Sequence, residues 1–106
     1  MKNASINIII ADDHEIFRDG FASLIHKCPG INLVADAANG KDLVQLTQNF
    51  LPDVVLTDVM MPVMNGIEAT REISSRFPSV GIIGFSMFNE DYLLKDSWKQ
   101  VLPAFF

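Results

Sequence analysis

The chain has 106 residues, of which 49% are hydrophobic and 20% are charged, so we expect a single globular domain at 1–106 and exclude an intrinsically disordered chain. Its formal net charge of −5 would repel a phosphate backbone, so no binding of nucleic acid is expected through this chain alone. Cys28 is the only cysteine, which excludes an internal disulfide and indicates a reducing, cytoplasmic location.

Short apolar runs alternate along the chain with longer stretches in which apolar residues recur at helical spacing. The first run, with isoleucine at 6, 8, 9 and 10, predicts a strand buried on both faces. It is too short for a signal peptide or a membrane span, so we expect no membrane attachment. The elements expected next are a helix at 14–27, a strand at 31–37, a second helix after Asn39-Gly40, a strand at 54–57, a third helix ended by Pro78, a strand at 80–85 and a fourth helix from Asn89.

Each of the first three helices has an apolar face that is expected to pack on a sheet. These faces comprise Phe17, Phe21, Leu24 and Ile25 in the first helix, Leu43, Val44, Thr47 and Phe50 in the second, and Ile67, Thr70, Ile73 and Phe77 in the third. Alternation of strands and helices predicts an α/β fold, a doubly wound parallel sheet with helices on both faces.

Polar side chains follow three of the predicted strands. Asp12 and Asp13 follow the first, Asp58 the third and Ser86 the fourth. Ligands of doubly wound sheets bind outside the carboxyl ends of the strands, so these residues are expected to converge at one edge. Three gathered carboxylates repel one another unless a cation is present, and oxygen ligands suit Mg²⁺ or Mn²⁺.

Each of these residues also has a structural explanation. Asp12 with Glu15 fits a helix capping box, and Asp13 could simply favour the positive end of the helix. Asp58 could be a turn residue, although a turn does not explain three carboxylates at one place. Ser86 could donate to a phosphoryl oxygen or serve as a turn serine.

Three segments carry a resemblance to a known family: "IIIADDHEIFRDG", "DVVLTDVMMPVMNGIEATREI" and "IIGFSMFNEDYLL". They resemble a response-regulator receiver domain of two-component signalling, over roughly 6–95. The "DDHxxxRxG" and "SM" details are similar to receivers that precede a LuxR-type helix-turn-helix domain. The resemblance implies a flavodoxin-like fold with strand order 2-1-3-4, a sensor histidine kinase as partner, and Mg²⁺ as cofactor.

The resemblance also implies roles for individual residues. Asp58 would accept the phosphoryl group, Asp13 would bind the metal directly, Asp12 would bind it mainly through water, and the backbone carbonyl of Met60 would complete the protein ligands. Ser86 would bond the phosphoryl group. Such a domain assists its own phosphorylation and slow dephosphorylation and is not a conventional turnover enzyme.

Other residues of the motifs are expected to have structural roles. Pro62 and Gly66 would shape the loop over the site. His14 could be read as a phosphoryl donor, but residues at its place in the family are usually exposed on the helix, and we adopt that interpretation.

The tail at 97–106, "SWKQVLPAFF", departs from the family, which continues with a fifth strand bearing a lysine and a last helix. Read one base earlier, its codons permit "LEAGAxG" followed by apolar residues, the usual family pattern. We therefore interpret the chain as a receiver truncated by a frameshift near 97, with the fifth strand incomplete or absent; a natural divergent terminus is the alternative. An uncovered fourth strand would recruit other chains, so a homo-oligomer is expected.

Two further functions are considered. A pseudo-receiver would bind proteins independently of phosphorylation, which the absent lysine favours and the intact acidic residues oppose. A flavodoxin-like binder of a nucleotide or flavin is disfavoured, since no glycine-rich phosphate loop follows the first strand.

Overall fold

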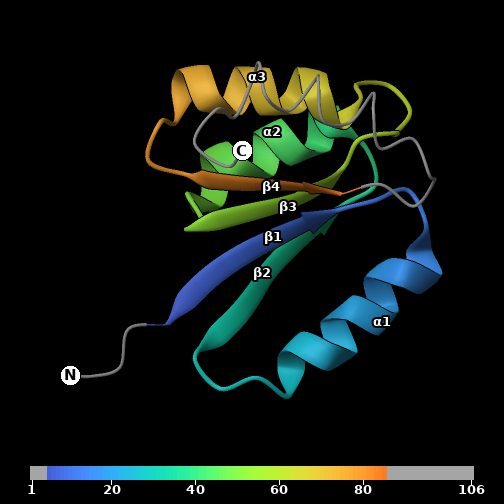
Figure 1. The fold of residues 1–106 in the computed structure, drawn as a ribbon, viewed down its shortest axis with the longest axis vertical. Coiled ribbons are helices and arrows are strands. Elements are labelled where there is room, and N and C mark those ends of the chain that lie inside the picture. Colours follow the sequence, from blue (N-terminus) through green and yellow to red (C-terminus); the bar gives the residue numbers. More distant parts are fainter. Residues whose placement is uncertain (1–4, 86–106) are drawn as a thin grey trace.

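The computed structural model describes residues 5–85, in which a parallel sheet is flanked by helices on both faces. The strands lie in the order β2-β1-β3-β4, and all neighbouring pairs are parallel (Figure 1). In chain order the elements are β1 (Ile6–Ala11), α1 (Glu15–His26), β2 (Ile31–Ala37), α2 (Gly40–Phe50), β3 (Val54–Asp58), α3 (Gly66–Arg76) and β4 (Gly81–Phe85). The predicted topology is confirmed.

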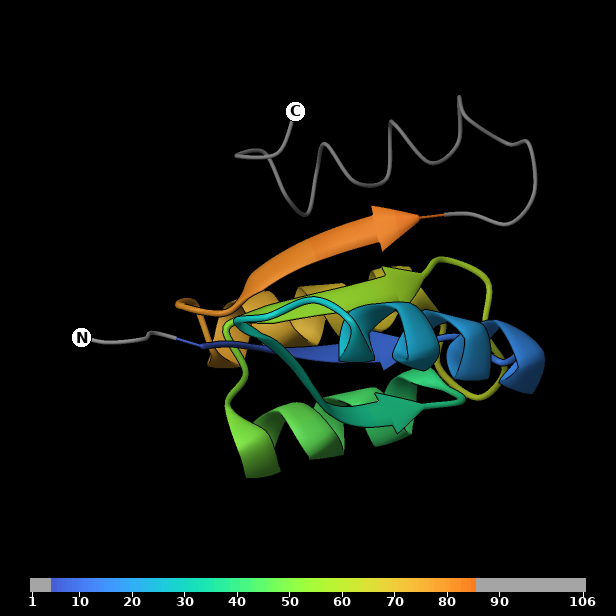
Figure 2. The same ribbon diagram turned by 90° about the horizontal axis from the view of Figure 1, so that it is seen from below.

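Helices α2 and α3 cover one face of the sheet, and α1 covers the other (Figures 1 and 2). The core lies between the central strands and the α2–α3 layer. It contains Ile9, Val55 and Ile82 from three strands, together with Leu43 from α2 and Ile73 from α3. The continuous apolar runs of β1 and β3 are explained by this burial on a parallel sheet.

Most predicted boundaries agree with the structure to within one or two residues. The strand expected at 31–37 is observed at Ile31–Ala37, and β3 extends one residue further than expected, to Asp58. Helix α1 begins at Glu15, with His14 as its N-cap, so the expected start at 14 is one residue early. Among residues 5–85, no helix is both long and apolar enough to cross a membrane.

Three predictions of burial are wrong. Ile6, at the start of β1, is 46% exposed, because only the later isoleucines of β1 lie in the middle of the sheet. Leu24 is 65% exposed on α1, and Phe50 is 48% exposed at the end of α2. Phe50 is the last residue of α2, where helical periodicity continues after contact with the sheet has ended. Leu24 is exposed although Ile25, one residue further along α1, is half-buried, so Leu24 lies outside the half-buried face of this helix.

Some sequence-based predictions concern residues outside 5–85. These are Ser86, the fourth helix expected from Asn89, and the incomplete fifth strand of the tail.

Candidate functional site

The register of the central strands brings Asp12 and Asp58 together. Ala11, the last residue of β1, lies opposite Thr57 of β3, so the next residues along the two parallel strands are Asp12 and Asp58. Asp13 and His14 follow directly on the connection to α1. One ligand atom from each of Asp12, Asp13, His14 and Asp58 can be chosen so that all four lie within 4.8 Å of one another. The predicted convergence of the three carboxylates is confirmed.

Within residues 5–85, both central carboxylates are fully buried, and each has an oxygen without a hydrogen-bond partner. Asp58 accepts a hydrogen bond at Oδ1 from the backbone N–H of Met60 at 3.2 Å, whereas its Oδ2 has no partner. Asp12 accepts at Oδ1 from the backbone N–H of His14 at 2.7 Å, and its Oδ2 is likewise without a partner. Because a buried oxygen without a donor is costly, these atoms fit the binding of a cation between them.

The pKa of Asp58 is raised from its ordinary value of 3.8 to about 6, and burial is the largest cause. The carboxylates of Asp12 and Asp13 contribute to this increase, and the hydrogen bond from Met60 opposes it. A carboxyl group in such surroundings gains from a nearby positive charge, since the cation favours its ionised form. The clustered negative charge and the oxygen donors therefore both suit a hard divalent cation.

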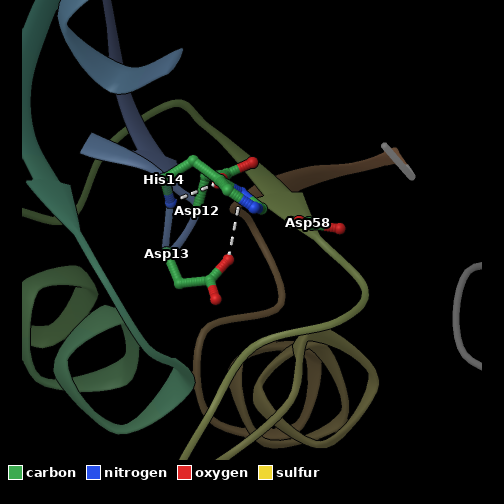
Figure 3. Close-up of side chains that lie close together, drawn as sticks. All are labelled: Asp12, Asp13, His14 and Asp58. Atoms are coloured by element: carbon green, nitrogen blue, oxygen red, sulfur yellow. Dashed lines mark hydrogen bonds and ion pairs between the residues drawn. The ribbon is translucent and has the colours of Figure 1, made fainter. Parts of the chain in front are cut away.

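The ring of His14 belongs to the same cluster (Figure 3). Its Nδ1 lies 2.6 Å from Oδ1 of Asp12 and 3.2 Å from Oδ1 of Asp13. The side chain of His14 is 48% exposed and that of Asp13 is 36% exposed, so both form the open side of the site. The hydrogen bond to Asp12 and its charge raise the pKa of His14. His14 is therefore exposed in part, as the sequence suggested. It is not an isolated surface residue, because its ring contacts Asp12 and Asp13.

The loop after β3 is held close to the site by two glycines. The N–H of Gly66 donates to the carbonyl of Val59, and a Cβ at Gly66 would overlap the backbone of Asp58. The N–H of Gly40 donates to the carbonyl of Met64, which a Cβ at Gly40 would also overlap. The absence of a side chain at both positions allows the start of α2 and the start of α3 to pack directly on this loop.

Arg18 is the arginine of the "DDHxxxRxG" segment, and it contacts the end of β1, although the sequence predicted no role for it. Its Nη1 donates to the backbone carbonyl of Asp12 at 2.6 Å, and its Nε lies 3.3 Å from a carboxylate oxygen of Asp36 at the end of β2. Arg18 is six residues beyond Asp12, on the first turn of α1, from which its side chain reaches the end of β1. An arginine at this spacing after the paired acids is the signal that could have identified it.

The capping-box explanation of Asp12 is wrong, because its carboxylate accepts from His14 and no side chain caps α1. A capping box exists instead at α3, between Asn65 and Glu68. Met60 lies beside the site, and its backbone N–H donates a hydrogen bond to the carboxylate of Asp58.

The chain matches a family model described as "Response regulator receiver domain" over residues 8–101. It is 38% identical over 86 residues to the transcriptional regulatory protein DegU of Brevibacillus brevis, covering 81% of this chain and 36% of that protein. It is 37% identical over 95 residues to the transcriptional regulatory protein LnrK of Bacillus subtilis, covering 90% of this chain and 43% of that protein. The chain thus spans about two fifths of the length of these curated relatives.

Solved structures resemble the chain over most of its length. A two-component response regulator of the LuxR family from Aurantimonas is 33% identical, with a TM-score of 0.82, covering 90% of this chain and 68% of that one. The isolated REC domain of RcsB from Salmonella enterica, in the presence of phosphomimetic BeF₃⁻, is 28% identical, with a TM-score of 0.81. The match covers 92% of this chain and 72% of that one. Together with the strand order, these similarities confirm the flavodoxin-like fold.

Proposed function

Because this chain belongs to the response regulator receiver domain family, with relatives of the LuxR type, we propose that its Asp58 accepts a phosphoryl group from a sensor histidine kinase. The observation that carries this proposal is the buried Asp58 beside Asp12, each with an oxygen that no donor in the described part of the chain satisfies. In the transfer, an Asp58 oxygen bonds to phosphorus, the bond from phosphorus to the kinase histidine nitrogen breaks, and that nitrogen keeps the electron pair. The product is an acyl phosphate.

A divalent cation, Mg²⁺ or Mn²⁺, would be held by carboxylates of Asp12, Asp13 and Asp58 and by the backbone carbonyl of Met60. When bound, the cation supplies positive charge that offsets the negative charge of the carboxylates and the phosphoryl group. The donor set and the 4.8 Å cluster support this assignment. Met60 is supported by its place directly beside Asp58, to which its N–H donates.

The chain's own residues prepare Asp58 for this reaction. The N–H of Met60 orients one carboxylate oxygen at 3.2 Å, which leaves Oδ2 free to attack. With a pKa of about 6, Asp58 is mainly ionised at neutral pH even before its charge is offset, so it can act as the nucleophile. Ser86, directly after β4, would donate its hydroxyl to a phosphoryl oxygen.

The structure of RcsB with a phosphomimetic supports the proposal by family analogy. The pseudo-receiver alternative lacks comparable support, since all three carboxylates are in place at the site. Membership of the receiver family also disfavours the nucleotide or flavin binder. A cytoplasmic location, in which the kinase would be met, is part of the same proposal.

Phosphorylation is tested by treating the chain with acetyl phosphate, reducing it with borohydride and mapping the label by mass spectrometry. Asp58 should be labelled only in the presence of Mg²⁺, and Asp58→Asn should abolish the label. Asp19→Asn, an exposed carboxylate on α1, is the matched control and should be labelled like the unchanged chain. A label on His14 would contradict the assignment of the acceptor.

Cation binding is tested by calorimetric titration with Mg²⁺. The unchanged chain and Asp19→Ala should bind with the same affinity, whereas Asp13→Ala should lose binding because too few anionic ligands remain. Equal affinity in Asp13→Ala would refute the ligand assignment.

We also propose that copies of the chain associate through β4. Within residues 5–85, β4 is bonded to β3 on one side only, and its Ile83 is 45% exposed. Apolar strands at the border of a sheet pair with other chains. Light scattering over a concentration series should detect dimers or larger species, and Ile83→Lys should shift them to monomer. A monomer at every concentration would overturn this part of the proposal.

A further inference from the structure

The ring of His14 occupies a place within the carboxylate cluster that its backbone helps to fix. Its own N–H donates to Oδ1 of Asp12 at 2.7 Å, and Nδ1 of the ring lies 2.6 Å from the same oxygen. The side chain makes no capping bond to α1, so the local helix geometry does not account for its position. Figure 3 shows the ring lying among the carboxylates of Asp12, Asp13 and Asp58, although the side chain of His14 is 48% exposed.

A second observation points to a ligand at this place. Within residues 5–85, Oδ2 of Asp12 and Oδ2 of Asp58 are buried and have no hydrogen-bond partner, and both residues belong to the cluster that includes the ring. The two orphaned oxygens therefore provide the acidic half of a binding site, and the imidazole provides a nitrogen at its open side.

The spacing of these atoms suits a six-coordinate cation. Adjacent ligands of an octahedral ion at metal–ligand distances of about 2.0–2.1 Å lie about 3 Å apart. The distances from Nδ1 of His14 to Oδ1 of Asp12 and to Oδ1 of Asp13, 2.6 and 3.2 Å, lie on either side of that value. An ion could thus replace the proton that the ring and the carboxylate share, with only small movements of the side chains.

We propose that His14 supplies an imidazole nitrogen to the cation site, so that the site prefers transition-metal dications such as Mn²⁺, Co²⁺ and Ni²⁺ to Mg²⁺ beyond what its carboxylates alone would give. This inference rests on the proposed function, because the same carboxylates hold the cation. It differs from the expected ligand set of Asp12, Asp13, Asp58 and Met60, which contains oxygen only.

The reason is the chemistry of the donors. Mg²⁺ favours oxygen ligands and gains little from a nitrogen. Affinity for nitrogen-containing sites rises in the order Mn²⁺, Co²⁺, Ni²⁺. Removal of the ring should therefore weaken binding of these ions in the same order and leave Mg²⁺ binding nearly unchanged.

The experiment is a set of calorimetric titrations of the full chain, without an affinity tag, with Mg²⁺, Mn²⁺, Co²⁺ and Ni²⁺ at about pH 8, where free imidazole is neutral. His14→Ala should reduce the affinity for Ni²⁺ about tenfold or more, that for Co²⁺ and Mn²⁺ progressively less, and that for Mg²⁺ less than about threefold. His26→Ala, which removes an exposed histidine at the other end of α1, is the matched control and should change none of them.

A direct spectroscopic measurement removes dependence on the folding of the variant. Pulsed electron paramagnetic resonance of Mn²⁺ bound to the unchanged chain should detect coupling to an imidazole nitrogen, which His14→Ala should remove and His26→Ala should keep. Absence of nitrogen coupling, or equal loss of affinity for Mg²⁺ and Ni²⁺ in His14→Ala, would overturn the role of His14 and leave the carboxylate site intact. Failure of the unchanged chain to bind any of the four ions would instead refute the proposed cation site itself.

Discussion

The two faces of the sheet are covered in different ways. On one face α2 buries Leu43 and Val44 and α3 buries Ala69 and Ile73, whereas α1 on the other face has no fully buried residue. The aromatic ring of Phe17 on α1 lies 5.5 Å from that of Phe85 on β4 and is only half-buried. Apolar packing therefore stabilises the α2–α3 face more than the α1 face.

This difference continues into the functional site. The Asp58 side is fixed by close backbone packing, through Gly40 and Gly66, onto the loop after β3. The α1 side is positioned by polar contacts, through His14 and Arg18 to the end of β1. A closely packed acceptor beside an open, polar entrance suits the proposed transfer of a phosphoryl group to Asp58.

The largest difference between the faces is expected from loss of core volume. Ile73→Ala on α3, at a fully buried position, should lower the free energy of unfolding by about 2–5 kcal/mol, since it removes buried surface and leaves a cavity. Leu24→Ala on α1, where the side chain is 65% exposed, should change it by less than about 0.5 kcal/mol. Urea unfolding followed by circular dichroism measures both, and equal losses would show that α1 packs as tightly as α3.

A second comparison uses glycines on the two faces. Gly66→Ala should destabilise the chain by about 2–4 kcal/mol, because a Cβ would overlap the backbone of Asp58 and displace the bond from Gly66 to Val59. Gly20→Ala on α1 should stabilise the chain by about 0.5–1 kcal/mol, because alanine favours a helix and an added Cβ would meet no heavy atom of the described residues within 4 Å. Thermal unfolding of the two variants should give shifts of opposite sign. Destabilisation by Gly20→Ala would mean that α1 is closely packed at this position.

The smallest effect concerns the charge of Asp58 in the metal-free chain. Its pKa is raised from 3.8 to about 6 in the folded state, so the folded chain binds more protons than the unfolded chain between these values. The stability contributed by protonated Asp58 is therefore present at low pH and is lost as the pH rises through about 6. Asp58→Asn should remove this loss and stabilise the chain on the order of 1–3 kcal/mol at pH 7, with little gain near pH 4.

This pH dependence is measured by urea unfolding between pH 4 and 8 with a chelator present. Asp13→Asn is the control. Because the side chain of Asp13 is 36% exposed, this substitution should raise the free energy of unfolding by less than Asp58→Asn does. A gain from Asp58→Asn that is independent of pH would contradict the titration of Asp58 in this range.

Much of the fold and part of the site could be predicted because they depend on local patterns. The apolar runs predicted β2 at Ile31–Ala37, and the predicted parallel topology placed Asp12 and Asp58 at the same edge of the sheet. The exposure of Ile6 and Phe50 could not be predicted in this way. Periodicity states which residues share a face, but not how far along that face the neighbouring element extends.

The sequence by itself determined the α/β architecture, the order of the elements and the gathering of three carboxylates, since hydrophobic period and chain order are properties of the sequence alone. Only the tertiary structure decided that, among the residues described, Asp12 and Asp58 each keep an unpaired buried oxygen. It also decided that the ring of His14 joins them and that Arg18 reaches the carbonyl of Asp12. These features depend on side-chain rotamers and on the register of β1 against β3. Both are set by packing among residues far apart in the chain, which no local pattern records.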